Sequence, residues 1–350
     1  MKAKSYAAQA ADSPLSYYEF ERREPGEHDV EIRIQFCGVC HSDIHTARGD
    51  WGQAHYPCVP GHEIIGTVTR VGSAVSKHKV GDRVGVGCLV NSCGTCDACL
   101  AGLEQYCANG PTWTYESVDP IDGSNTLGGY STVIVVTEHF VVAIPEKLSS
   151  AEAAPLLCAG ITTYSPLRHW NAAPGMTVGI IGLGGLGHMG VKYAKAMGAE
   201  VHVITTSPEK AEAATAYGAD GVIVSSSASD MQAAVRKFDL LIDTVPVGHD
   251  LQPYLELLNV DGSIVLVGPL SPMEGFHGVN VIGGRKSIAG SGIGGIKETE
   301  EMLAYSAEHG IVPEIEIIDI KNVNEAWDAL TSKQMSKRYV IDIEKSFEKL

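Results

Sequence analysis

The sequence has no long apolar run and no excess of positive charge. Its first residues, Met-Lys-Ala-Lys-Ser-Tyr-Ala-Ala-Gln, contain no apolar stretch that ends in a cleavage site, and no later stretch has the unbroken length of a membrane span. Lysine and arginine number 26 against 42 aspartates and glutamates, which gives a formal charge of -16. Binding to nucleic acid or to an anionic membrane surface requires surplus basic side chains, so we expect neither partner. Without a cleavable or membrane-spanning segment, the cytoplasm is the default location. The negative charge fits a neutral substrate better than an anionic one, although solubility alone is the simpler explanation of that charge.

The chain is too long for one core. Its 350 residues exceed what a single domain usually supports, and 44% apolar residues with 19% charged residues describe an ordinary globular protein. We therefore expect two domains.

The nine cysteines are an odd number in a chain without secretory features. Disulfides are rare in the cytoplasm, so this usage indicates metal ligands with some thiols left over. The leftover thiols are Cys37, Cys58 and Cys88.

The stretch from position 37 to position 63 contains candidate ligands of a catalytic metal. A thiol, an imidazole and a carboxylate, at Cys40, His62 and Glu63, form a soft and borderline set that suits zinc better than calcium or magnesium. Cys158 is the best candidate to complete the site, because it is the only cysteine far outside the N-terminal third. Two cysteines and one histidine would leave a position for water, substrate or Glu63, as catalytic zinc sites do. The alternative is that these are core thiols and a hydrogen-bonded loop histidine.

A second group of thiols lies in a short polar segment. Cys93, Cys96, Cys99 and Cys107 follow one another with too few apolar residues between them to fold that segment. Four such thiolates predict a closed, structural zinc site in a lobe at residues 88–110, with zinc-to-sulfur distances of about 2.3 Å. A disulfide pair or a redox Cys-x-x-Cys is the alternative.

The rest of the first part of the chain is rich in predicted strands. Residues 30–34 alternate apolar and polar side chains, as in a half-buried strand, and residues 64–87 hold short strands separated by glycines. Two further strand-like runs follow the lobe, at 127–136 and 140–145. From Ser150, a possible N-cap, the composition changes to an alanine-rich helix, and we place the domain boundary there.

A glycine-rich motif opens the second domain. Residues 177–190 read Thr-Val-Gly-Ile-Ile-Gly-Leu-Gly-Gly-Leu-Gly-His-Met-Gly, an apolar run followed by a Gly-x-Gly-x-x-Gly pattern and then a helical spacing of apolar residues. Glycines there let the backbone approach a pyrophosphate at a helix N-terminus. Alternating strands and helices continue to residue 289, which predicts a doubly wound parallel sheet of six strands. The residues expected to contact the dinucleotide in this loop are Gly182, Gly184, Gly185, Leu186 and Gly187.

The end of the second predicted strand indicates which nicotinamide cofactor is used. NAD-binding proteins place an acidic residue there to hold the ribose hydroxyls. This chain instead has Thr205, Thr206 and Ser207, followed by Lys210. A carboxylate at that point would repel the extra phosphate of NADP, since like charges about 4 Å apart cost up to about 4 kcal/mol at an effective dielectric near 20. The pattern favours NADP(H), unless the hydroxyls only cap the next helix and the lysine is a surface charge.

On these motifs the chain resembles the zinc-dependent medium-chain alcohol dehydrogenases. The resemblance rests on Gly-His-Glu-Ile-Ile-Gly at 61–66 with Gly72 and Val75, on Gly-Val-Cys-His-Ser-Asp-Ile-His at 38–45, and on Leu-Leu-Cys-Ala-Gly-Ile-Thr-Thr-Tyr at 156–164. It covers nearly the whole chain and is greatest to the cinnamyl-alcohol-dehydrogenase branch, which includes bacterial broad-range aldehyde reductases. It implies a GroES-like catalytic domain from residues 1–152 and 294–350, and a Rossmann domain from residues 153–293.

The resemblance also implies roles for residues around the first zinc site. Ser42 would exchange a proton with the zinc-bound oxygen, and His45 would relay it through the cofactor ribose. Asp43 would orient the ring of His62, a common arrangement at zinc sites. We interpret Glu63 as an exchanging ligand rather than a base. Taken singly, the residues at 42, 43 and 45 would read as a turn serine, a helix-capping aspartate and a surface histidine.

Two tryptophans, Trp51 and Trp113, are expected to line an apolar substrate pocket, although large aromatics are more often part of the core. The resulting prediction is an NADP(H)-preferring alcohol dehydrogenase with two zinc ions per chain, acting mainly as a reductase of aromatic and medium-chain aldehydes. The alternatives are an NAD-linked alcohol or polyol dehydrogenase and a non-catalytic descendant that binds zinc and nucleotide. The resemblance further implies a possible homodimer, joined through the sixth strand of the nucleotide domain.

Overall fold

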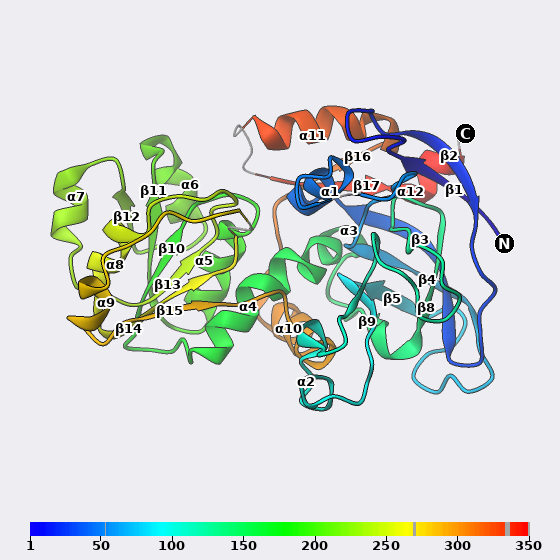
Figure 1. The fold of residues 1–350 in the computed structure, drawn as a ribbon, viewed down its shortest axis with the longest axis horizontal. Helices are drawn as coiled ribbons and strands as arrows, with labels where there is room; N and C mark the ends of the chain where they lie inside the picture. The colour runs from blue at the N-terminus through cyan, green and yellow to red at the C-terminus, as the bar shows by residue number, and fades with distance from the viewer. Residues whose placement is uncertain (53, 269–270, 333–336, 349–350) are drawn as a thin grey trace. The chain divides into compact units, whose positions relative to one another are not determined.

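The computed structural model describes residues 1–52, 54–268, 271–332 and 337–348. The chain forms two compact units (Figure 1): Met1–Cys158 together with Gly294–Leu350, and Ala159–Ile293. The sequence placed the first boundary between residues 152 and 153, whereas the first unit continues to Cys158. Cys158 therefore belongs to the same unit as the other predicted ligands of the catalytic zinc.

The first unit is built around strand β3 (Asp29–Gly38). Along one edge β3 pairs antiparallel with β4 (Ile64–Val71). Along its other edge it pairs with β8 (Val133–Thr137) at the N-terminal end and with β17 (Arg338–Asp342) at the C-terminal end, both antiparallel. Strand β17, near the C-terminus, thus joins a sheet whose central strand β3 lies near the N-terminus. The full sheet has the order β16-β17-β3-β4-β5-β9, with β8 added on β3.

Strand β3 is more deeply buried than its sequence predicts. Val30, Ile32 and Ile34 are in the core and Arg33 is exposed, as the alternation requires, but Glu31 is buried as well. Its carboxylate is satisfied by Arg70 and by the hydroxyl of Thr69, which donates at 2.6 Å. One charged and one hydroxyl partner on the neighbouring strand β4 offset the cost of burying Glu31.

Short elements surround this sheet. The helix after position 150 is α3, and its N-cap is Ser149 rather than Ser150, because the side chain of Ser149 accepts from the backbone N–H of Glu152. The predicted helix near 299–308 is α10, which starts three residues earlier. The remaining elements of this unit are β1 (Lys2–Ala7), β2 (Ser16–Glu21), α1 (His41–Ala47), β5 (Arg83–Val86), β6 (Leu89–Asn91), α2 (Asp97–Leu100), η1 (Glu104–Tyr106), β7 (Thr112–Trp113), η2 (Glu138–Phe140), β9 (Val142–Ala143), α3 (Ser150–Ala153), η3 (Ala154–Leu157), α10 (Ile296–His309), β16 (Ile315–Ile318), η5 (Ile320–Asn322), α11 (Val323–Thr331) and α12 (Ile343–Glu348).

The second unit is a parallel six-stranded sheet in the order β12-β11-β10-β13-β14-β15. This order reverses between the first and fourth strands, as in dinucleotide-binding folds, and confirms the predicted doubly wound sheet. The strands are β10 (Thr177–Ile181), β11 (Glu200–Thr205), β12 (Gly221–Val224), β13 (Phe238–Asp243), β14 (Leu258–Leu266) and β15 (Ser287–Gly290). The helical segments are α4 (Ala159–His169), α5 (Gly187–Ala196), η4 (Pro208–Lys210), α6 (Ala211–Ala216), α7 (Ala228–Ala233), α8 (Gln252–Leu257) and α9 (Val279–Ile282).

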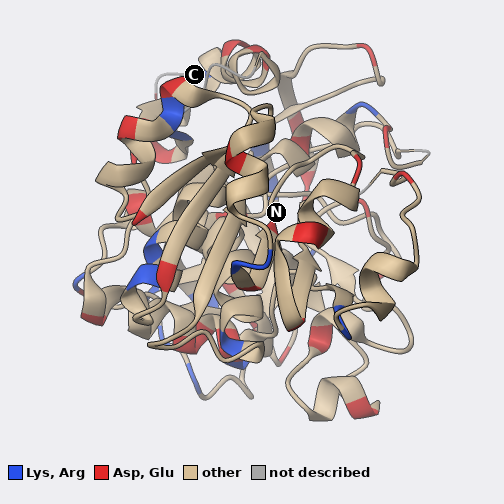
Figure 2. Ribbon diagram, turned by 90° about the vertical axis from the view of Figure 1, so that its left-hand side faces the viewer, with Lys and Arg blue, Asp and Glu red and all other residues tan. Residues whose placement is uncertain are grey.

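All nine cysteines lie within the described residues, and all are free thiols there. Among the helices that the structure describes, none is long and apolar enough to cross a membrane. In Figure 2, lysine and arginine segments are interspersed with aspartate and glutamate segments.

Candidate metal centres and dinucleotide site

The first candidate metal centre collects its ligands from three segments. Cys40 is the N-cap of α1, while His62 and Glu63 directly precede β4. Cys158 directly follows the short helix η3. The turn that leads to His62 requires glycine, because Gly61 has φ +105° and an added Cβ would come within 2.9 Å of Tyr130, Cys37 and the backbone of Gly129.

The four side chains converge as a metal site requires. Their donor atoms all lie within 4.8 Å of one another, and all four residues are buried. His62 Nε2 and Glu63 Oε2 are buried without a hydrogen-bond partner among the described residues. The sulfurs of Cys40 and Cys158 are 3.9 Å apart. Two sulfurs about 2.3 Å from a tetrahedral zinc would be about 3.8 Å apart, so the arrangement fits zinc.

Cys88 adds a thiol that the sequence motifs left unassigned. It forms a hydrogen bond with Cys158, and hydrogen bonds with Cys40 and Cys88 raise the pKa of Cys158 well above its usual value. The bond from the Cys158 thiol in turn lowers the pKa of Cys40 well below its usual value. These directions favour the thiolate form at Cys40 over Cys158.

Glu63 has a buried cationic partner that the sequence did not reveal. Arg338, the first residue of β17, donates to Glu63 Oε1, and both side chains are almost fully buried. Burial raises the pKa of Glu63 to about 7, although the charge of Arg338 lowers it. Gly38 provides the space for this carboxylate, because a Cβ there would lie 1.9 Å from Glu63 Oε2.

Asp43 lies behind His62. Its carboxylate is fully buried and is 3.2 Å from His62 Nδ1. It also accepts from the backbone N–H of Cys40 at 2.9 Å, so it caps α1 as well. Two tyrosines that the sequence analysis did not single out, Tyr115 and Tyr130, reach the same group. Burial raises the pKa of both phenols well above the usual value, so both keep their protons.

The proposed proton relay residues lie on α1 beside the cluster. Ser42 Oγ is 3.7 Å from Cys40 Sγ. His45 Nδ1 is 2.8 Å from Asp50 Oδ2, and its ring is 5.3 Å from the ring of Trp51. Trp51 and Trp113 are 46% and 42% exposed in the described part of the first unit. Neither tryptophan is therefore part of the hydrophobic core, which was the alternative to a place in the substrate pocket.

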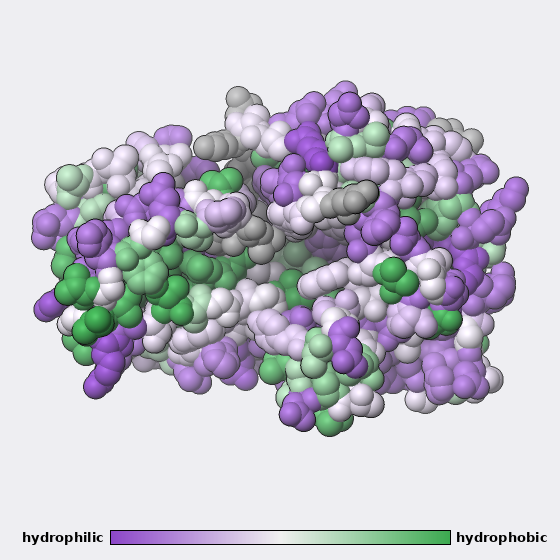
Figure 3. Space-filling view, in the orientation of Figure 1, coloured by the Kyte–Doolittle hydropathy of each residue, from purple (hydrophilic) through white to green (hydrophobic). Residues whose placement is uncertain are grey.

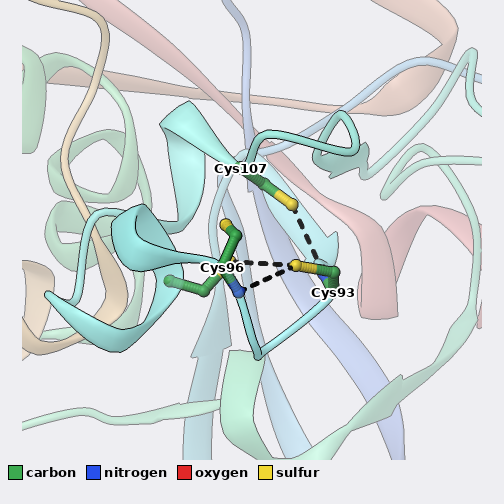
Figure 4. A group of neighbouring side chains, drawn as sticks. Cys93, Cys96 and Cys107 are labelled. Carbon is green, nitrogen blue, oxygen red and sulfur yellow. Dashed lines mark hydrogen bonds between the residues drawn. The ribbon is translucent and has the colours of Figure 1, made fainter.

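The second candidate centre is local and partly exposed. Cys93, Cys96, Cys99 and Cys107 bring their sulfurs within 4.8 Å of one another, and Figure 4 shows three of these side chains pointing together. Cys93 Sγ and Cys99 Sγ are 3.9 Å apart, again the edge of a zinc tetrahedron. Backbone N–H groups of Thr95 and Cys96 lower the pKa of Cys93 to about 6. This group fits a closed structural zinc site better than a disulfide.

Glu104 attaches this lobe to the rest of the first unit. Its buried carboxylate lies 2.7 Å from His139 Nε2 and accepts from the backbone N–H of Ile296, the first residue of α10, at 3.0 Å. The lobe is therefore anchored at its base while its thiols remain partly accessible.

The glycine-rich loop of the second unit has the geometry of a pyrophosphate cradle. Gly182 has φ +87°, and a Cβ on Gly187 would lie 2.1 Å from the carbonyl oxygen of Gly182. A Cβ on Gly184 would meet no described atom within 4 Å, so within the described part of the chain there is open space over the loop. Helix α5 starts at Gly187, directly after this loop and without a side-chain cap among the described residues, and a helix N-terminus is a favourable place for an anion.

The end of β11 carries hydroxyls instead of a carboxylate. Thr205 is buried and accepts from the backbone N–H of Ser207 at 3.1 Å, while Thr206 and Glu209 are exposed. Lys210 Nζ donates to the carbonyl oxygen of Leu183 at 3.2 Å, which places its charge against the glycine-rich loop. These residues fit a cofactor with an additional phosphate.

Fold and sites together define a zinc-dependent dehydrogenase with a dinucleotide-binding domain. Residues 26–146 match the model of the alcohol dehydrogenase GroES-like domain, and residues 185–308 match that of the zinc-binding dehydrogenases. The chain therefore belongs to the zinc-dependent medium-chain alcohol dehydrogenase family, as its relatives also show.

Relatives match over nearly the full length. The chain is 51% identical to aldehyde reductase YahK of Escherichia coli K12 over 98% of both chains. It is 51% identical to NADP-dependent alcohol dehydrogenase C of Mycobacterium tuberculosis over 97% of this chain and 98% of that one. Among solved structures, a cinnamyl alcohol dehydrogenase of Sorghum bicolor has a TM-score of 0.96 at 45% identity, covering 99% of both chains. That of Helicobacter pylori, complexed with NADP(H), has a TM-score of 0.93 at 41% identity, covering 99% of both chains.

Proposed function

We propose that this chain reduces aromatic and medium-chain aldehydes with NADPH at the centre formed by Cys40, His62, Glu63 and Cys158. The observation that carries the proposal is this buried mixed donor set, in which two ligand atoms have no hydrogen-bond partner among the described residues and one carboxylate is held by an arginine. Named relatives include an aldehyde reductase and an NADP-dependent alcohol dehydrogenase, which supports the same reaction class.

The residues divide the chemistry between them. When bound, zinc supplies a Lewis acid for the carbonyl oxygen and NADPH supplies the hydride. Ser42 gives a proton from Oγ, and His45, held by Asp50, resupplies it. The charge of Arg338 opposes the effect of burial on Glu63 and so favours its carboxylate form, the form that can act as an exchanging ligand.

The cofactor preference follows from the end of β11. An NAD-linked enzyme would place a carboxylate there, whereas this chain has Thr205, Thr206, Ser207 and the ammonium of Lys210. A non-catalytic descendant would have no reason to retain a buried open set of ligands beside Ser42. The NADP(H) reading is thus favoured over both alternatives.

Initial rates with benzaldehyde, cinnamaldehyde and a medium-chain aldehyde, under NADPH and NADH separately, test the proposal. We expect wild-type protein to prefer NADPH, and Lys210→Ala to weaken that preference by about tenfold or more, the scale of one charged hydrogen bond. Lys195→Ala is the matched control, because it removes the same charge from the same unit at a site paired with Asp220. Equal use of both cofactors in wild-type and Lys210→Ala protein would contradict the NADP site.

We also propose a cytoplasmic homodimer. Strand β15 is one of the two edge strands of the parallel sheet, and Figure 3 shows apolar residues gathered over the neighbouring helix α9. Val279 and Ile282 of that helix are 67% and 80% exposed. Exposed apolar patches next to an edge strand favour pairing with a second copy. Sedimentation at several concentrations gives the mass directly.

A further inference from the structure

The carboxylate of Asp43 is nearly saturated before it reaches His62. It accepts from the backbone N–H of Cys40 at 2.9 Å, from that of Gly61 at 3.0 Å and from the hydroxyl of Tyr130 at 3.0 Å. An ionised carboxylate offers about four lone-pair sites, so only one remains for a further donor. His62 Nδ1 lies 3.2 Å from Asp43 Oδ1, at the long limit for an N–H to oxygen bond.

Tyr115 offers His62 a closer partner. Its hydroxyl is 3.0 Å from His62 Nδ1, and the two rings lie nearly parallel with centroids 5.5 Å apart. The hydroxyl of Tyr115 is also hydrogen-bonded to Asp43. The phenol therefore contacts the imidazole both through its oxygen and across its face.

The direction of each hydrogen bond follows from the unpartnered nitrogen. His62 Nε2 has no hydrogen-bond partner in the described residues and belongs to the group of converging ligand atoms. A histidine that ligates through Nε2 carries its proton on Nδ1. That N–H donates to the oxygen of Tyr115, and the Tyr115 hydroxyl in turn donates a hydrogen bond to Asp43. The three side chains thus form a row of hydrogen bonds that runs from His62 through Tyr115 and ends on the buried carboxylate of Asp43.

We propose that Tyr115 is a positioning residue for the catalytic metal: it fixes the tautomer and orientation of the His62 imidazole together with Asp43. The inference rests on the ligand set of the proposed function. Tyr115 lies two residues after the end of β7, outside the zinc motifs at 37–63 and 156–164, and the inference gives it a role in supporting the metal.

The competing explanation is that Tyr115 only fills the core and its hydroxyl takes whichever acceptor is near. Tyr130 provides the matched control. It is also buried, its hydroxyl also bonds to Asp43, and replacement by phenylalanine removes the same single oxygen. Of the two, Tyr115 contacts His62.

The experiment compares Tyr115→Phe and Tyr130→Phe as full-length zinc-loaded proteins. Zinc release to an excess of a chelating dye is followed in time, with Cys40→Ala protein identifying the phase that belongs to the four-cysteine lobe. We expect Tyr115→Phe to release the other zinc about 10 to 100-fold faster than wild type, the range typical of groups that orient metal ligands. Tyr130→Phe should stay within about threefold, and the lobe phase should be unchanged in both.

A second measurement separates metal support from general packing. Melting temperatures are compared for each protein with and without the catalytic zinc, and absorption spectra are compared after cobalt substitution. The proposal predicts that Tyr115→Phe reduces the stabilisation by metal and shifts the cobalt spectrum. Equal losses in metal-loaded and metal-free protein, or equal release rates in the two variants, would overturn it.

The outcomes also separate this inference from the proposed function. Wild-type protein with two zinc ions and full activity, combined with wild-type behaviour of Tyr115→Phe, would overturn the role of Tyr115 alone. If Cys40→Ala protein held as much zinc as wild-type protein, the ligand set itself would be contradicted.

Discussion

The two metal centres differ in how the protein prepares them. The centre at Cys40 is buried, mixes sulfur, nitrogen and oxygen, and draws on segments 118 residues apart. The lobe centre uses four thiols from 15 consecutive residues, numbered 93 to 107, three of them only partly buried. The first is surrounded by side-chain partners such as Asp43 and Arg338, whereas the second is supported mainly by backbone N–H groups. A site that must exchange a ligand depends on further side chains that hold its ligands in position, whereas a closed site is held mainly by its four ligands.

The largest test of this difference removes one ligand from each centre. Cys40→Ala should lower kcat/KM by about 10³-fold or more, because a Lewis acid contributes several kcal/mol to the barrier. Zinc content should fall from two ions per chain to one, as measured by atomic emission, and the melting temperature should fall by no more than the stabilisation that the catalytic zinc gives the wild-type protein.

The lobe variant Cys107→Ala is the matched control. It should also hold one zinc ion, but the loss should appear as proteolytic cleavage within residues 88–110, with activity per folded molecule reduced less than tenfold. Identical activity losses in the two variants would abolish the distinction between the centres.

A smaller test concerns the room around Glu63. In Gly38→Ala the new methyl group would lie 1.9 Å from Glu63 Oε2, so the carboxylate must move. We expect kcat/KM to fall about 10 to 100-fold, the scale of a 1 Å misplacement at an active site. In the lobe, Gly94→Ala should leave kcat/KM unchanged, since its Cβ meets nothing within 4 Å, and positive φ there costs only about 1 kcal/mol of stability. Wild-type kinetics in Gly38→Ala would show that the carboxylate needs no such space.

The smallest effect is expected on stability, at Glu104, where the lobe contacts the rest of the first unit. Burial raises the pKa of Glu104, but hydrogen bonds from His139 and the backbone N–H of Ile296 outweigh it, so the pKa lies below the usual 4.5. A carboxyl with a lowered folded-state pKa stabilises the protein above its unfolded-state pKa and loses that contribution as the pH falls through the folded value.

Glu104→Gln should therefore be less stable than wild type at pH 7, by about 1 to 3 kcal/mol. The difference should shrink as the pH falls below 4.5, as measured by urea unfolding at each pH. A difference independent of pH would show that the amide replaces the carboxylate fully.

Sequence patterns predicted those features that depend on residues close together in the chain. The lobe, the glycine-rich loop and the six parallel strands each follow from spacing within a few residues, because turn geometry and side-chain period act over that range. The grouping of Cys40, His62, Glu63 and Cys158 followed from chemistry and from the family resemblance, since no spacing rule joins positions so far apart.

The partners of those ligands could not be predicted in this way. Arg338 opens an apolar strand and reads as a surface charge, until pairing of β17 with β3 brings it to Glu63. Tyr115 reads as one aromatic among several in a short irregular segment. Even the N-cap at Ser149 instead of Ser150 depends on which of two serines adopts an extended backbone. Such contacts are set by tertiary packing, which a local pattern does not contain.

The position of Arg338 also bears on how the protein is synthesised. Glu63 emerges from the ribosome 275 residues before the arginine that neutralises it, a delay of roughly tens of seconds at ordinary translation rates. Until then the first unit lacks β17, and closing its core would bury an unpaired carboxylate, which is strongly unfavourable. The unit formed by Ala159–Ile293, complete within one continuous segment, is free to fold earlier. The part of the protein that is translated first is thus the last to be finished.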